Sequence, residues 1–146
     1  MPMAAQERKN APVIISGFAS KEVRQGVSWK VFFQAQDPDG DMNRIVCILE
    51  QPGVGPQPAS IIGIRDDRRR NLSGYIYLNT ASPSGIQFAS CRLTIQIRDK
   101  RDNISNPVSF PLSLNPRAVP QTPPPGGFQD EDLGPVQIPF PLMPSP

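Results

Sequence analysis

Three aspartates at positions 37, 39 and 41 are the residues whose spacing most clearly suggests chemistry. Carboxylate oxygens at such short intervals can ligate Ca²⁺, which takes six to eight oxygen ligands. If a later turn lies beside this one, it can complete the shell with Asp99, Asp102 and Asn103. The same D-P-D-G-D motif also has a local explanation, because Pro presets φ, Gly accepts positive φ and Asp caps nearby backbone. The sequence leaves both readings open.

Two cysteines, Cys47 and Cys91, are the other pair with chemical potential. A disulfide between neighbouring strands would indicate an oxidising compartment. An antiparallel pairing of their two segments, however, sets Cys47 opposite Thr94, an offset that strains the Cα separation of about 7 Å that a disulfide allows. Two buried free thiols are the alternative.

The absence of histidine from the chain limits catalysis. It removes the commonest general base and metal ligand and any Ser–His or Cys–His pair, and two cysteines cannot build a Cys-only zinc site. A carboxylate pair such as Asp41 and Asp99 is the remaining acid–base option, and no sequence feature sets it in a cleft. We therefore expect no enzyme and no cofactor other than Ca²⁺. A net charge of +2 argues against a nucleic-acid partner.

Alternating apolar and polar residues predict the elements that position these groups. From Val27 the chain reads V-S-W-K-V-F-F-Q-A-Q, which sets Trp29, Val31 and Phe33 on one face. Phe32 is a misfit on the outer face, where Tyr75 and Tyr77 are also expected; exposed aromatics can bind sugar or protein. In all, seven strands are expected, over residues 11–18, 27–36, 43–50, 59–65, 72–79, 91–98 and 108–114.

Seven short strands with turn signals between them, and no helical periodicity, predict an all-β fold. At this spacing they are typical of a single immunoglobulin-like Greek-key sandwich. Ten prolines lie between Pro116 and Pro146, and a packed sheet tolerates few of them. We therefore expect a flexible arm over residues 1–10, the sandwich over 11–115 and an extended Pro-rich tail over 116–146.

Two turns resemble those of a known superfamily. D-P-D-G-D after a strand ending in Q-A-Q resembles the B–C turn of bacterial cadherin-like and immunoglobulin-like repeats, and I-R-D-K-R-D-N-I-S at Ile97–Ser105 is similar to their F–G turn. The resemblance, over about Val27 to Leu114, implies a β-sandwich with both turns at one end. We expect a periplasmic or extracellular location. The first ten residues contain no signal-peptide pattern, so the alternatives are a chain that stays in the cytoplasm or one that starts after a removed signal.

The tail predicts a partner. Its last ten residues alternate apolar side chains with prolines, and an extended segment of this kind can fill pockets on another protein. We expect the contact to be made by Ile138, Phe140, Leu142 and Met143. The sequence thus predicts a non-catalytic subunit that docks its sandwich and tail onto a larger, membrane-associated assembly, without a transmembrane segment of its own. The alternative is a Ca²⁺-assisted adhesion or carbohydrate-binding module of a bacterial surface protein.

Overall fold

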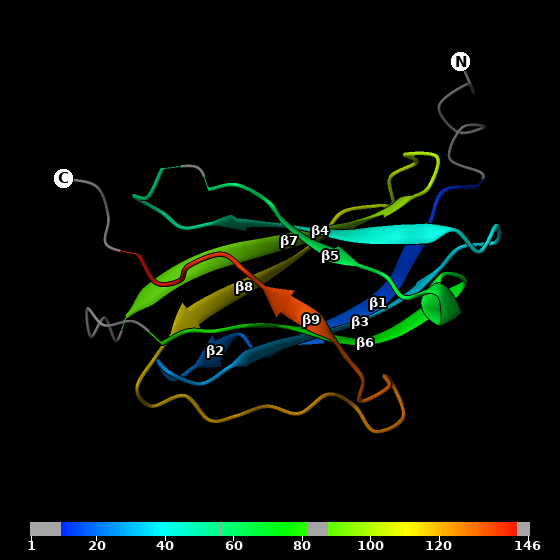
Figure 1. Cartoon of the computed structure of the whole chain (residues 1–146). Helices are drawn as coiled ribbons and strands as arrows, with labels where there is room; N and C mark the ends of the chain where they lie inside the picture. Colours follow the sequence, from blue (N-terminus) through cyan, green and yellow to red (C-terminus); the bar gives the residue numbers. More distant parts are fainter. Residues whose placement is uncertain (1–9, 56, 82–87, 143–146) are drawn as a thin grey trace, which may run out of the picture.

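The computed structural model describes residues 10–55, 57–81 and 88–142, and its regular structure is β. Two sheets face each other, one with four strands and one with five (Figure 1). Nine strands form within the described residues: β1 Val13–Ala19, β2 Glu22–Val23, β3 Trp29–Gln36, β4 Met42–Glu50, β5 Ser60–Gly63, β6 Asn71–Leu78, β7 Ala89–Asp99, β8 Val108–Leu114 and β9 Asp132–Val136. A 3₁₀ turn at Asp66–Arg68 precedes β6.

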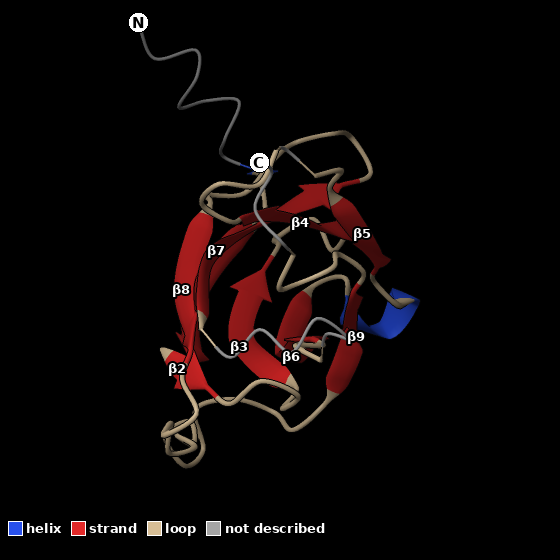
Figure 2. Ribbon diagram, turned by 90° about the vertical axis from the view of Figure 1, so that its left-hand side faces the viewer, coloured by secondary structure: helices blue, strands red, loops and turns tan. Residues whose placement is uncertain are grey.

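The order of strands is β1-β3-β6-β9 in one sheet and β2-β8-β7-β4-β5 in the other. Most neighbours run antiparallel, but β2 lies parallel to β8 and β9 parallel to β6. Figure 2 shows β9 at the side of the sandwich, where it lies between β6 and β5. The fold is therefore an all-β sandwich, as the alternation in the sequence predicted.

The core lies between the sheets and draws on every strand. Its largest fully buried side chains include Trp29 and Phe33 of β3 and Ile95 and Ile97 of β7. Trp29 is 1% exposed, and its indole Nε1–H donates to the Ser20 carbonyl at 2.8 Å. The prediction that Trp29 packs inward is confirmed.

Seven of the nine strands correspond to the predicted segments. The alternation also predicts Val13 and Ile15 together on one face of the first strand and Val27 on the same face as Trp29, and none of these three side chains is in the core. In β1, Val13 and Ile15 are 49% and 52% exposed, whereas Ile14 is buried. The V-I-I run is apolar on both faces, so alternation could not choose between them, and the strand also carries a bulge between Ile14 and Ser16. Val27 is 45% exposed because it precedes β3 and is outside the alternation.

The expectation of seven strands is also wrong, and the segment expected as an extended Pro-rich tail is not separate from the sandwich, because β9 belongs to it. It pairs with β6 from Tyr75 to Leu78, and beyond it Ile138 and Phe140 join the core. The globular fold therefore does not end at Asn115. Gly and Pro inside β9 weaken its strand signal, and β2 is too short at two residues to show a period.

The segment between β8 and β9, residues 115–131, crosses the outer face of the four-stranded sheet as a strap (Figure 1). Side chains from loops of the domain fasten it at both ends. Near its start Arg24 donates to the Ala118 carbonyl at 3.1 Å, and at its end the Arg68 guanidinium binds both oxygens of Glu131, the shortest contact being 2.6 Å. The prolines of the strap thus lie on the domain itself.

Within the described residues, no helix has the length and hydrophobicity needed to cross a membrane.

Candidate functional site

The turn at 37–41 and the turn at 99–103 meet at one end of the sandwich, as predicted. The Lys100 amide donates to the Asp41 carbonyl at 3.0 Å. The Asp37 amide donates to the Arg70 carbonyl at 3.0 Å, so the charged loop before β6 lies at the same end. Three loops far apart in the sequence therefore form this surface.

Asp37 organises the first turn. Its side chain is 1% exposed, and its two oxygens accept the amides of Asp39, at 3.1 Å, and Asp41, at 3.3 Å. Burial raises the pKa of Asp37 to about 6, and a side-chain hydrogen bond with Asp41 contributes to the increase. The carboxyl is thus a structural cap that holds a proton at mildly acidic pH.

Asp99 performs the same task in the second turn. It is 1% exposed; Oδ1 accepts the amides of Arg101 and Asn103, and Oδ2 accepts the Asn103 side-chain amide, all within 2.9 Å. Asp102 adopts a left-handed φ of 65° and is exposed. The Asp99 side chain thus serves its own turn, and neither Asp99 nor Asp102 belongs to the aspartate cluster of the first one.

A cation has some of the ligands it needs at the first turn. One oxygen from each of Asp37, Asp39 and Asp41 lies within 4.8 Å of the others, and Asp41 Oδ1 is buried without a hydrogen-bond partner. The Arg70 guanidinium, however, already brings a positive charge to this turn. It donates to the Pro38 carbonyl and lies close against Gly40, where a Cβ, if the residue had one, would be 3.0 Å from the guanidinium. The geometry fits turn capping fully and a Ca²⁺ shell in part.

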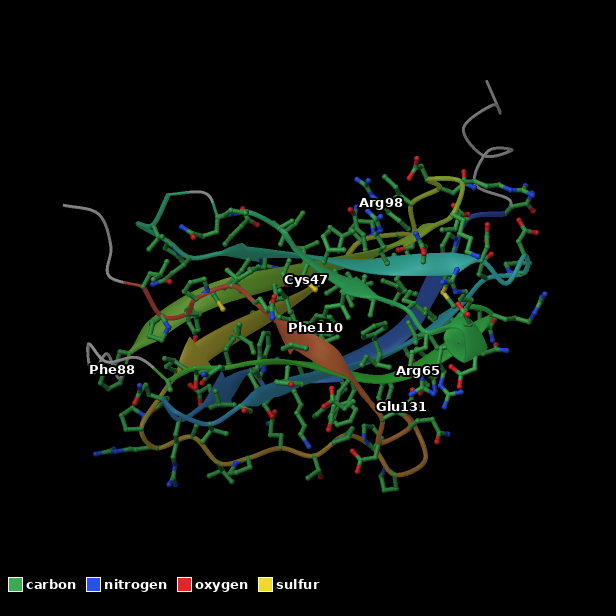
Figure 3. All side chains as sticks on the ribbon, in the orientation of Figure 1. Cys47, Arg65, Phe88, Arg98, Phe110 and Glu131 are labelled. Atoms are coloured by element: carbon green, nitrogen blue, oxygen red, sulfur yellow. The ribbon has the colours of Figure 1, made fainter. Side chains whose placement is uncertain are left out.

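The two cysteines are free and buried in the five-stranded sheet. Cys47, visible between the sheets in Figure 3, lies opposite Ile95, one residue from the partner predicted. Cys91 lies on β7, four residues from Ile95, which is about 13 Å along the strand. This separation excludes a disulfide between Cys47 and Cys91. Burial raises the pKa of each thiol to about 12, so neither is a nucleophile at neutral pH.

The expected partner-binding residues of the tail do not face a partner. Ile138 is 5% and Phe140 2% exposed, and both pack in the chain's own core, so this prediction is wrong for them. Leu142 is half-buried, and its backbone N–H and carbonyl bond the Gln51 side chain at 3.0 and 2.7 Å. Met143 lies outside the described residues.

The outward aromatics are largely covered by the strap. Phe32 is only 9% exposed; its ring lies 5.3 Å from that of Tyr75 and 5.9 Å from that of Phe128 of the strap. Tyr75 and Tyr77 are half-buried. The flat, exposed aromatic face that a sugar-binding reading requires is therefore reduced to the edges of two tyrosines.

The outer face of the five-stranded sheet is a surface that the sequence reasoning missed. Val46 of β4 lies opposite Ile61 of β5, and Ile61 and Ile48 are 52% and 39% exposed. Next to them Arg44 of β4 lies directly opposite Arg98 of β7, whose side chain projects outward in Figure 3. The alternation within each strand shows which of these side chains face outward, but only the register between strands shows that they are neighbours.

No protein-family model, no curated protein and no solved structure matches this chain.

Proposed function

We propose that this protein is a non-catalytic interaction module that docks onto an acidic and apolar protein surface through the outer face of its five-stranded sheet. The observation that carries the proposal is the apolar cluster on that face, in which Ile48 and Ile61 are exposed beside the buried Val46, next to two arginines that form no ion pair within the described residues. We call this surface the β4–β5–β7 face and define it by Arg44, Val46, Ile48, Ile61 and Arg98.

The apolar residues of this face are unusual for a sheet face in contact with water. Val46, Ile48 and Ile61 are adjacent across β4 and β5, and strands with one face in water usually alternate apolar with polar residues. The neighbouring strands follow that rule with hydroxyl pairs on the same face, Thr94 with Ser109 at 2.8 Å and Ser90 with Ser113 at 3.1 Å. The apolar cluster is thus local, and a partner would remove it from water.

The charged part supplies specificity. Like charges directly opposite on antiparallel strands destabilise a sheet, and within the described residues neither Arg44 nor Arg98 forms an ion pair. Arginine is enriched at protein interfaces, and its rigid fork binds carboxylates in two-point contacts. An acidic partner would relieve the repulsion between the two guanidinium groups.

The strand order supports the finer fold assignment. The orders β1-β3-β6 and β2-β8-β7-β4-β5, with β2 parallel to β8, are compatible with an immunoglobulin-like Greek key in which the first strand changes sheets, and this compatibility supports the proposal. Domains of this architecture commonly act by surface recognition, an argument by analogy alone. We further propose that the partner belongs to a larger, extracytoplasmic assembly.

Two positions with equal exposure make the test sharp. Ile61 and Ile15 are both 52% exposed and lie on edge strands of opposite sheets. A photo-crosslinking residue at each position, in cells that express the full chain, should capture a defined protein from position 61 and not from 15. With that protein purified, Ile61→Asp should weaken binding at least tenfold, and Ile15→Asp should leave it unchanged.

Charge reversal tests the second half of the proposal. Arg44→Glu should slow association and reduce its salt dependence, because rim charges act mainly on the encounter rate. Equal capture from positions 15 and 61, or a captured partner that binds Ile61→Asp as well as the natural chain, would contradict the assignment of this face.

A Ca²⁺-binding module is the second candidate, favoured by the buried, unpartnered Asp41 Oδ1 beside two further carboxylates. Bound Ca²⁺ would raise the melting temperature by mass action. Because Arg70 already supplies positive charge to this turn, we expect little or no rise at millimolar Ca²⁺. A clear rise that Asp39→Ala abolishes would establish the site.

A further inference from the structure

A cavity of about 410 Å³ lies on the outer side of the four-stranded sheet, under the first part of the strap. Phe18 of β1 and Phe32 of β3, which are opposite each other in the sheet, contribute to its floor. Ala118, Pro120 and Pro123 contribute to its roof. This volume is within the range of sites for small ligands, which are mostly apolar with a few polar groups.

The strap is held over the cavity by its own backbone carbonyls. Ala118 accepts a hydrogen bond from Arg24 at 3.1 Å, and Gln121 accepts one from the Ser20 hydroxyl at 3.3 Å. Prolines have no N–H to offer. The walls therefore present apolar surface, and the exposed Val27 side chain is part of that surface.

The charges at the cavity have one sign. Arg24 and Lys30 line it, and no aspartate or glutamate in the described part of the chain does. Both are donors without acceptor capacity, and neither forms an ion pair within the described residues. The Lys30 ammonium lies 4.4 Å from the centre of the Tyr75 ring, a contact that stabilises a cation without neutralising it.

We propose that this cavity binds a small carboxylic acid with an apolar body. The body lies between the phenylalanines and the strap, and the carboxylate accepts hydrogen bonds from Arg24 and Lys30. The site is on the opposite sheet from the β4–β5–β7 face, so the inference goes beyond the proposed docking function. Its test is also independent, because neither set of variants touches the other surface.

The probe is 8-anilinonaphthalene-1-sulfonate, which combines an apolar body with an anion. Trp29, the single tryptophan of the chain, lines the cavity and reports binding by energy transfer. We expect one probe per folded chain, displaced by decanoate and at least tenfold less effectively by decanol. Lys30→Gln should weaken decanoate binding roughly tenfold, the effect of one charge-assisted hydrogen bond, whereas Lys21→Gln, an exposed lysine outside the cavity, should not.

A second pair of variants tests the cavity itself. Ser28→Phe fills space in the lining and should abolish probe binding, whereas Ser16→Phe, an exposed serine of β1 outside the lining, should preserve it. Near-ultraviolet circular dichroism checks that each variant keeps native packing, because the probe also binds partly folded states. Equal displacement by decanoate and decanol, or probe binding unaffected by Ser28→Phe, would overturn the proposal. So would binding to phosphatidylglycerol vesicles without any response to free decanoate, which would assign the surface to a membrane.

Discussion

Asp37 is a buried carboxyl whose proton affects the stability of the fold. Its pKa is about 6 in the folded chain against 3.8 when unperturbed, so between these values the folded state holds more protons than the unfolded state. The free energy of unfolding then falls as pH rises. The stabilisation from this group is complete below about pH 3.8 and is lost as pH passes through about 6.

We therefore predict that the free energy of unfolding falls by about 1–3 kcal/mol between pH 4 and pH 7 through this group. Urea unfolding at several pH values measures the change, and Asp37→Asn should flatten it. Asp39→Asn, at an exposed neighbour in the same turn, is the control and should keep the natural slope. A slope that Asp37→Asn leaves intact would show that another group titrates.

At the residue scale, the sequence predicted the local hydrogen bonds of a side chain better than its contacts with distant parts of the chain. The turn role of Asp37 follows from D-P-D-G-D itself, because the hydrogen bonds it makes are to the next few residues. Arg70, which lies over that turn, comes from 30 or more positions away and has no local signal there. Contacts set by the chain's long-range path, such as this one, could not be inferred from spacing.

Among the elements, β6 and β9 approach each other at a glycine. A Cβ on Gly74 would overlap the Glu131 carbonyl and lie 2.9 Å from the Leu133 side chain. That carbonyl accepts the Tyr75 amide at 2.9 Å. Because position 74 has no side chain, the last residue of the strap and the first residues of β9 can pack directly against β6.

We predict that Gly74→Ala lowers the free energy of unfolding by about 1–3 kcal/mol, the cost of forcing extra volume into a packed contact. Gly63→Ala is the matched control, because Gly63 also lies in a strand and has open space where its Cβ would be. Its effect should stay within about 0.5 kcal/mol. Thermal and urea unfolding measure both, and equal losses would show that β9 is not held against β6.

The C-terminal segment gives the largest expected effect at this scale. Val136, Ile138 and Phe140 are each at most 5% exposed, and full burial of such a side chain contributes about 1.5–3 kcal/mol. Their sum is roughly 5–9 kcal/mol as an upper bound, comparable with the whole stability of a typical domain, about 5–15 kcal/mol. Removing residues 132–146 should therefore leave an unfolded chain, the reverse of what the sequence led us to expect.

A pair of substitutions separates packing from length. Ile138→Asp should destabilise by several kcal/mol because it buries a charge, whereas Gln137→Asp adds the same charge at an exposed neighbour and should have little effect. Circular dichroism melts compare them. If both variants and the truncated chain melt like the natural protein, the segment is free to act as an arm on another subunit.

The elements show why the sequence predicted seven strands and missed two. Strands β3, β6, β7 and β8 alternate over most of their length, and β4 is an apolar run between turn residues, so each carries its own signal. The D-L-G-P-V of β9 contains two residues that disfavour strands, and it is fixed by tertiary contacts such as Gly134 against Ile62. The outer face of the five-stranded sheet depends likewise on register between strands, which no single segment encodes.

At the scale of the whole molecule, both sheets and the C-terminal segment from β9 to Phe140 share one core. Such a domain is expected to unfold as one cooperative unit. The two cysteines provide an internal measurement of this property. Cys47 is fully buried and Cys91 is 5% exposed, and they lie in β4 and β7, so each reports a different strand.

We predict that both thiols of the folded chain react with a thiol reagent at one shared slow rate, because each requires global unfolding before a thiolate can form. Mass spectrometry of the partly labelled protein should show unlabelled and doubly labelled chains with few singly labelled ones. Ser109→Cys, which adds a thiol on the exposed face of β8, should react at once and serve as the control. The natural chain should behave identically with and without a reducing agent, since its cysteines are free. Much faster labelling of Cys91 than of Cys47 would reveal local opening of the β7–β8 edge, and the sandwich would then consist of more than one cooperative unit.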